Sequence, residues 1–294
     1  MPTTTASLLD LLKSWPLAIL PHQLLSRLVR SATRWQPAWW KNTLIRLFIR
    51  HFHVDMSDAE APAAEDYPDF NSFFTRALRA GARPMDRNPL AILSPVDGCV
   101  SEAGDITNGR LIQAKGRDYS LSALLGGNED RARPFQDGKF VTLYLSPRDY
   151  HRIHMPCRGR LLETTYVPGR LFSVAPHTTR AIPNLFTRNE RLVTLFDTDA
   201  GAVAMVLVGA IFVSCTETVW GGTVNPDMGM DLQTTRFDHP DSKTVELQPG
   251  DEMGRFNMGS TVILLYGPGR NDWVNTLQSG QPVRLGETIG YRPG

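Results

Sequence analysis

Short apolar segments separated by turn residues fill the chain from about residue 91 onward. Segments of β-branched, aliphatic and aromatic residues between glycine, proline and aspartate are typical of strands. The pattern predicts a β-rich domain, a sandwich or barrel, and the helices expected before it make the fold class α+β. The segments are KFVTLYLS, LLETTYVPG, RLVTLFDTDAG, AVAMVLVGAIFVSC and TVILLYGPG.

The N-terminal part is apolar and basic. Asp10 and Asp55 are its only acidic residues up to residue 55, and tryptophans cluster at positions 35, 39 and 40. We expect amphipathic helices in SLLDLLKSW, HQLLSRLVRSATRW and WWKNTLIRLFIRHF. Aromatic rings beside arginines suit a helix in the interface of an anionic membrane. A helical cap packed on the core is the alternative. The predicted domains are an N-terminal helical region, 1–60, and a β-rich domain, 61–294.

Two further segments carry structural expectations. DFNSFFTRALRAGARP predicts a helix whose apolar face includes Phe70, Phe73, Phe74 and Leu78 and which Gly81 stops. The polar stretch NPDMGMDLQTTRFDHPDS predicts a mobile loop.

Composition narrows the class of protein. The 294 residues carry a net charge of +1, so no overall field favours nucleic acid. Cys99, Cys157 and Cys215 are too few for a disulfide framework and favour reduced thiols in the cytoplasm. We find no convincing secretory signal and no run of eighteen apolar residues that could span a membrane.

Three stretches bear groups capable of chemistry: LSPVDGCV with Asp97, YLSPRDYHRIHMPCRG with His151 and His154, and Gly259-Ser260 before the last long strand. Taken singly, each is more simply a turn or a strand start. Taken together, a hydroxyl, an imidazole and a carboxylate are the parts that activate a serine.

These stretches also resemble a known family, the pyruvoyl-dependent phosphatidylserine decarboxylases of the proteobacterial type. The resemblance runs from about residue 44 to 270. One departure is Met258, where the family usually has leucine; both side chains are unbranched at Cβ and similar in volume, so we expect cleavage to survive. The matching motifs are SPVDG, QAKGRDYSLSALLGGN, YLSPRDYHRIHMPC, YVPGRLFSV, PNLFTRNERLVTLFDT, ETVWGGTV and EMGRFNMGSTVILLYGPG.

The resemblance implies a self-processing triad of Asp97, His154 and Ser260, with His151 serving the decarboxylation step. Ser260 would attack the unhindered carbonyl of Gly259, the chain would be cut between them, and residue 260 would become a pyruvoyl group, the covalent cofactor. No metal is expected. The implied fold is an N-terminal helical membrane-association region with a β-rich catalytic domain.

The implied partners are phosphatidylserine and an anionic membrane surface, with no nucleic acid. Two chains would arise from one precursor, and the processed unit would form a homodimer. The expected location is the cytoplasmic side of the cell inner membrane, with peripheral attachment.

Three alternative functions remain open at this stage. A zinc hydrolase would use His151, His154 and Cys157, although an odd spacing puts the two histidine rings on opposite faces of an extended chain. A pyridoxal-dependent decarboxylase would need a lysine, for which Lys115 is the best candidate. A non-enzymatic membrane-binding module would stay a single intact chain.

Overall fold

The computed structural model of the chain describes residues 7, 10–11, 14, 22–114, 116–210, 216–225, 229–239, 241–257 and 260–294. The first predicted helix, SLLDLLKSW, therefore lies mostly outside the described residues. The described α-helices are α2 (His22–Thr33), α3 (Ala38–Phe52), α4 (Phe70–Phe74), α5 (Leu121–Leu124), α6 (Glu129–Ala132), α7 (Pro176–Ala181) and α8 (Leu185–Arg188), with 3₁₀ turns η1 (Ala64–Asp66) and η2 (Arg133–Phe135).

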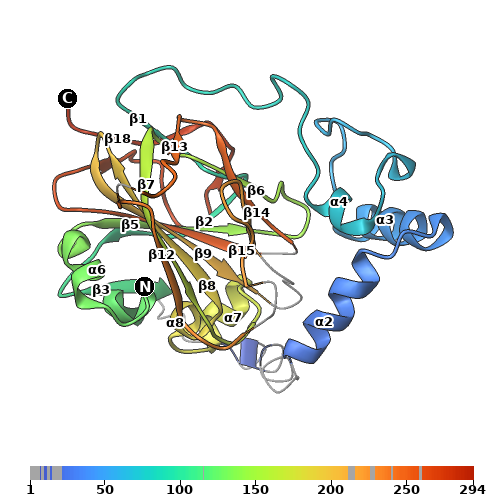
Figure 1. The fold of residues 1–294 in the computed structure, drawn as a ribbon, viewed down its shortest axis with the longest axis horizontal. Helices are drawn as coiled ribbons and strands as arrows, with labels where there is room; N and C mark the ends of the chain where they lie inside the picture. Colours follow the sequence, from blue (N-terminus) through green and yellow to red (C-terminus); the bar gives the residue numbers. More distant parts are fainter. Residues whose placement is uncertain are drawn as a thin grey trace.

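A large antiparallel sheet organises the molecule (Figure 1). Its strand order is β12-β7-β8-β9-β15-β5-β2-β17, and β13 pairs with β7. These strands are β2 (Gly98–Asp105), β5 (Lys139–Leu145), β7 (Gly159–Val167), β8 (Arg191–Thr198), β9 (Gly201–Gly209), β12 (Gln233–Arg236), β13 (Glu246–Leu247), β15 (Ser260–Tyr266) and β17 (Pro282–Val283).

Smaller sheets complete the β-structure. One has the order β1-β18-β16, another β11-β10-β14-β6, and β3 and β4 form a two-stranded pair. The α+β class is confirmed, and the described sheets are not closed into a barrel. The strands are β1 (Ala91–Leu93), β3 (Arg110–Ala114), β4 (Arg117–Ser120), β6 (Arg152–His154), β10 (Thr216–Thr218), β11 (Gly222–Thr223), β14 (Glu252–Phe256), β16 (Asp272–Trp273) and β18 (Thr288–Tyr291).

The large sheet is covered on both faces. Alternate residues of β15 enter two different cores: Val262 and Leu264 pack on the side of the small sheets, and Ile263 and Leu265 pack on the side of the β3–β4 pair and α5–α8. Such double burial explains why the central strands read as continuous apolar runs rather than as an apolar–polar alternation.

A third apolar cluster joins α3 to α4. Its buried members include Ile45 on α3 and the aromatic residues Phe70, Phe73 and Phe74 on α4. Among the residues that the structure describes, none of the helices has the length and apolarity needed to span a bilayer.

Two local predictions are wrong. The helix expected across DFNSFFTRALRAGARP is only the five residues of α4. Asp69 caps its start, but beyond Thr75 the chain turns away, because Leu78 bridges to Ala59. The stretch expected as a mobile loop contains β12, whose backbone pairs with β7. In both cases a partner distant in sequence decides the local structure.

Gly98 allows β2 to approach β5 closely. A Cβ atom at this position would lie 2.5 Å from the carbonyl oxygen of Tyr144. Gly104, on the same strand, has only a side-chain atom of Phe140 nearby, at 3.8 Å. A methyl group would therefore clash with the backbone at Gly98 and fit at Gly104.

We predict that Gly98→Ala lowers the free energy of unfolding by about 1–3 kcal/mol, the usual cost of overpacking. Gly104→Ala should change it by less than about 0.5 kcal/mol. Thermal unfolding of both variants beside the unchanged chain measures the difference. Equal losses in the two variants would contradict the close approach at Gly98.

Candidate active site

Ser260 is the first residue of β15, in the middle of the large sheet. It pairs with Leu145 of β5 on one side and Gly209 of β9 on the other. The side chain is fully buried, and its Oγ has no hydrogen-bond partner among the described residues. Met258 and Gly259 lie outside the described residues. A buried hydroxyl without a partner needs an explanation. Other buried hydroxyls of the described residues share this state, among them that of Thr261, so the position of Ser260 directly after Gly259 is what distinguishes it.

Asn257 is the last described residue before this serine, and two elements hold it. Its Oδ1 accepts a hydrogen bond from Nδ2 of Asn71 on α4, at 2.9 Å. Its Nδ2 donates to Oε1 of Glu217 on β10, also at 2.9 Å. The chain is thus anchored immediately on the N-terminal side of the Gly259-Ser260 pair.

Asp97 lies in the turn between β1 and β2, as the sequence predicts. Arg83 grips its carboxylate: Nε lies 2.9 and 3.1 Å from the two oxygens, and Nη2 lies 2.6 Å from Oδ2. The amide of Leu285 donates to Oδ1 at 2.9 Å. The hydrogen bonds of Arg83 to the Asp97 carboxylate raise the pKa of Arg83 above its usual range.

The same arginine also reaches the N-terminal region. Its Nη1 donates to Oδ2 of Asp58 at 2.7 Å, and this contact lowers the pKa of the Asp58 carboxyl. Arg83 therefore bridges Asp58 and Asp97. Its charge-assisted hydrogen bonds to the two carboxylates fix their relative positions.

His154 has both ring nitrogens engaged. Nδ1 lies 2.7 Å from the carbonyl oxygen of Gly250, and Nε2 lies 3.0 Å from the hydroxyl of Tyr150. Because a carbonyl can only accept, Nδ1 carries the hydrogen and Nε2 accepts from Tyr150. Burial lowers the pKa of His154, so the ring is neutral near pH 7. This tautomer is the one that a general base needs.

The predicted pairing of Asp97 with His154 is not among the hydrogen bonds of either residue. The backbone amide of His154 does donate to the Pro95 carbonyl at 2.9 Å, so the two segments adjoin. In this arrangement the carbonyl of Gly250 orients the imidazole. The role of Asp97 in the triad stays a prediction.

His151 lies in a different environment. It is fully buried, its ring centroid is 4.1 Å from that of Phe74, and Nδ1 donates to the Asp149 carbonyl at 2.8 Å. Nε2 has no partner among the described residues. Burial, reinforced by the charge of Arg76, lowers the pKa of His151 to about 3. A neutral imidazole with a free lone pair results.

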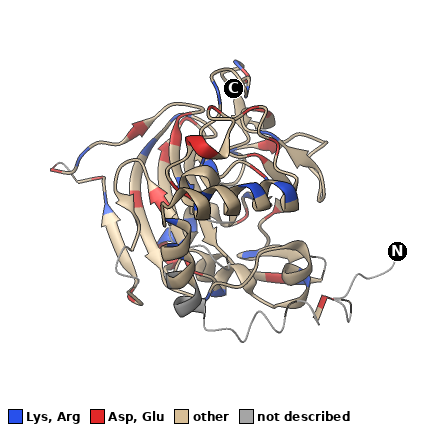
Figure 2. Ribbon diagram, turned by 90° about the vertical axis from the view of Figure 1, so that its right-hand side faces the viewer, with Lys and Arg blue, Asp and Glu red and all other residues tan. Residues whose placement is uncertain are grey.

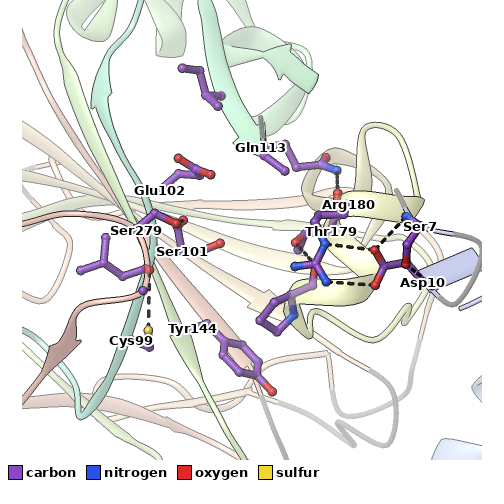
Figure 3. Close-up of a pocket in the computed structure, with 15 residues that line it drawn as sticks. Ser7, Asp10, Cys99, Ser101, Glu102, Gln113, Tyr144, Thr179, Arg180 and Ser279 are labelled. Carbon is purple, nitrogen blue, oxygen red and sulfur yellow. Dashed lines mark hydrogen bonds and ion pairs between the residues drawn. The ribbon is translucent and has the colours of Figure 1, made fainter. Parts of the chain in front are cut away.

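A cavity of about 680 Å³ has Asp97, Ser146, Asp149 and Tyr150 in its lining. Ser260, His151 and His154 are not among its lining residues. A second cavity of about 850 Å³ shares part of its wall, and its lining is drawn in Figure 3. There Tyr144 and Cys99 lie opposite the ion pair of Arg180 with Asp10. The residues common to both cavities are Cys99, Tyr144, Pro176 and Gly280.

The residues of the alternative sites can now be placed. Within the described part of the chain, no group of three or more His, Cys, Asp or Glu side chains is arranged to hold a metal ion. Burial raises the pKa of the Cys157 thiol to about 11, which disfavours the thiolate that zinc binds. Lys115, the candidate for a pyridoxal site, lies outside the described residues.

Sequence reasoning missed Arg83, Tyr150 and Gly250. Tyr150 is inside the histidine-bearing motif, beside His151, so a signal for it was present. Arg83 and Gly250 carried none, because the first is 14 positions from Asp97 and the second is 96 positions from His154.

Comparison with known proteins confirms the resemblance. The family model described as phosphatidylserine decarboxylase matches residues 70–291, and one described as PSD matches residues 12–53. Three curated relatives, each named phosphatidylserine decarboxylase proenzyme, come from Ectopseudomonas mendocina, Nitrosococcus oceani and Pseudomonas aeruginosa. They are 51%, 51% and 50% identical to this chain over 272, 283 and 271 residues. The alignments cover 92%, 95% and 92% of this chain and 95%, 92% and 93% of the relatives. The chain belongs to the phosphatidylserine decarboxylase family.

Proposed function

We propose that this chain is a proenzyme that cuts itself between Gly259 and Ser260 and then decarboxylates phosphatidylserine to phosphatidylethanolamine. The observation that carries the proposal is Ser260 itself. Its hydroxyl is buried without a partner at the start of a central strand, directly after a glycine. The proenzyme names of the relatives support the same conclusion.

Self-cleavage would use groups of this chain alone. His154 Nε2, released from the Tyr150 hydroxyl, takes the proton of Ser260 while Oγ adds to the Gly259 carbonyl carbon. The peptide bond breaks and an ester forms. Elimination then releases the Gly259 carboxylate and leaves dehydroalanine at position 260, and hydrolysis with loss of ammonia yields the pyruvoyl group. Asp97 supports this step through its charge near the imidazole.

In the proposed decarboxylation, the pyruvoyl group supplies an electron sink for the charge left by departing carbon dioxide. His151 supplies the proton to the substrate carbon. Its Nδ1 hydrogen is held by the Asp149 carbonyl, so Nε2 is the ring atom that carries the transferred proton. Burial and the charge of Arg76 lower the pKa of His151, so a proton on Nε2 is readily given up to the carbon.

We predict that Ser260→Ala stays one full-length chain, because no hydroxyl remains to attack, whereas the unchanged protein yields two fragments on a denaturing gel. His154→Ala should slow cleavage by roughly 10²–10⁴, the usual value of general-base assistance. Appearance of the same two fragments in Ser260→Ala would mean that an outside protease cuts the chain.

The same preparations test the reaction. Borohydride added with phosphatidylserine should attach the mass of a lipid amine to the small fragment of the unchanged protein and to no fragment of Ser260→Ala. Decarboxylation without this adduct would contradict the pyruvoyl group.

The pH dependence of cleavage tests the base. Burial lowers the pKa of His154 below 6.5, so the imidazole stays neutral at a pH where an exposed histidine is protonated. An ordinary base of pKa 6.5 would lose about tenfold in rate between pH 8 and 5.5. We predict a smaller loss of cleavage rate. The rate is measured on freshly translated precursor that is diluted into buffers between pH 8 and 5.5. A tenfold loss centred near pH 6.5 would contradict a buried base.

Membrane attachment through residues 1–60 is part of the proposal, with residues 61–294 as the catalytic domain. Leu28, Trp35, Trp39 and Leu47 are exposed although large and apolar. The ring centroids of Trp35 and Trp39 are 5.5 Å apart. Helices α2 and α3 project from the sheets in Figure 1, and Figure 2 shows lysine and arginine positions along helices on that side. We place the protein peripherally on the cytoplasmic side of the inner membrane, as a homodimer.

We predict that replacing Trp35 and Trp39 by serine weakens flotation with anionic liposomes, because interfacial aromatic side chains are lost. Binding of the unchanged protein should fall between 0.1 and 1 M salt, as the Debye length shrinks from about 10 to about 3 Å. Replacing exposed Tyr291, on a C-terminal strand, by serine is the control. Equal flotation of all three proteins would exclude the N-terminal anchor.

A further inference from the structure

Arg76 is a buried cation without a carboxylate partner among the described residues. Arg76 follows α4 in the sequence, and the residue is only 4% exposed. Nη2 donates to the carbonyl oxygens of Arg148 and Asp149, at 3.0 and 3.4 Å. Nε and Nη1 have no hydrogen-bond partner in the described part of the chain. Burial of an ion without a counter-charge is costly, so such a residue calls for a reason.

Arg76 lines the cavity of about 680 Å³ that also contains Asp97 and Tyr150. Burial lowers the pKa of its guanidinium, which nevertheless remains charged because arginine keeps its proton in proteins. The wall of the cavity thus includes a deeply buried cation whose Nε and Nη1 donate to no described residue. Asp97 and Asp149 line the same cavity and act on Arg76 without an ion pair, so a ligand anion would supply a direct counter-charge.

The position of Arg76 relates it directly to the proposed chemistry. Arg76 Nη2 and His151 Nδ1 donate to the same carbonyl oxygen, that of Asp149. Adjacent α4 residues contact both side chains. The guanidinium carbon of Arg76 lies 5.6 Å from the ring centroid of Phe73, and the ring of Phe74 is tilted by 41° against that of His151.

A further polar atom without a partner lies near this point. His151 Nε2 is buried and lacks a hydrogen-bond partner among the described residues. Ser146 lines the cavity and follows Leu145, the register partner of Ser260. The cavity wall therefore comes within one residue of the strand position that pairs with the serine that becomes the reacting group.

We propose that Arg76 binds the phosphodiester of the phospholipid headgroup, an inference that rests on the proposed function. The planar guanidinium fork matches the oxygens of phosphate and of carboxylate. The phosphodiester is favoured because it keeps its charge throughout the reaction. A cation gripping the carboxylate would stabilise the substrate more than the transition state, in which that charge is leaving.

The test compares Arg76→Gln and Arg76→Lys with Arg79→Gln, an exposed arginine three residues along that pairs with Asp58 at the surface. All are first checked for cleavage and for the pyruvoyl mass. Arg76→Gln should raise KM for phosphatidylserine roughly ten- to a hundredfold, the value of a charged hydrogen bond. The deciding readout is KM, because loss of the Arg76 charge beside His151 also changes kcat. Arg76→Lys should recover part of the loss, and Arg79→Gln should behave as the unchanged enzyme.

Two inhibitors separate the phosphodiester from the carboxylate. Phosphatidylethanolamine has the phosphodiester but no carboxylate, and a long-chain O-acylserine has the carboxylate but no phosphate. Arg76→Gln should weaken inhibition by phosphatidylethanolamine as much as it raises KM, and should leave inhibition by the O-acylserine unchanged. The reverse pattern, or an unchanged KM, would overturn the inference.

A second measurement covers the case in which Arg76→Gln is not cleaved. Binding of glycerophosphoethanolamine is then measured by calorimetry on the uncut Ser260→Ala chain, with and without Arg76→Gln. The double variant should bind at least about tenfold more weakly. Equal affinity, or no binding to the Ser260→Ala chain itself, would overturn the inference. An unchanged enzyme that is cleaved but does not decarboxylate would instead contradict the proposed function.

Discussion

Burial of β15 on both faces is the constraint on which the rest of the structure depends. Alternate side chains of this strand enter two separate cores, and β5 and β9 pair with it along its whole length. From Val262 onward both faces of this strand are lined by large hydrophobic side chains, so each face needs a covering layer. The small sheets supply one layer, and the β3–β4 pair with its short helices supplies the other.

The same constraint decides the character of the site. Ser260 begins the strand, so its hydroxyl is removed from water without gaining a partner in the described residues. Immediately upstream, Asn257 is held by α4 and β10. The Gly259-Ser260 pair is thus connected at both ends to well-packed structure. That arrangement suits a reaction in which the backbone itself is the substrate, because the position of the attacking group is set by the fold.

The sequence predicts the strands well where burial dictates composition. The segment TVILLYGPG reads as a strand because every residue of β15 is buried. The sequence predicts secondary structure poorly where contacts between distant residues determine it. Helix α4 ends early because Leu78 forms a β-bridge with Ala59, and β12 forms because it pairs with β7. The same limit applies to the site. Asp97, His151, His154 and Ser260 carry recognisable motifs, whereas the partners of Asp97 and His154 come from elsewhere in the chain.

The seven-residue pairing of β15 has a consequence for the cut protein. On the proposed cleavage, the small fragment would begin inside the core and remain clamped between β5 and β9. The finished enzyme would then be a complex of two polypeptides whose interface is the former interior of one domain. Folding would have to precede cutting, and a mature molecule that lost its structure would have to regain it as a bimolecular association. Because the peptide bond is not remade, a cut molecule cannot return to the single-chain precursor that folded first.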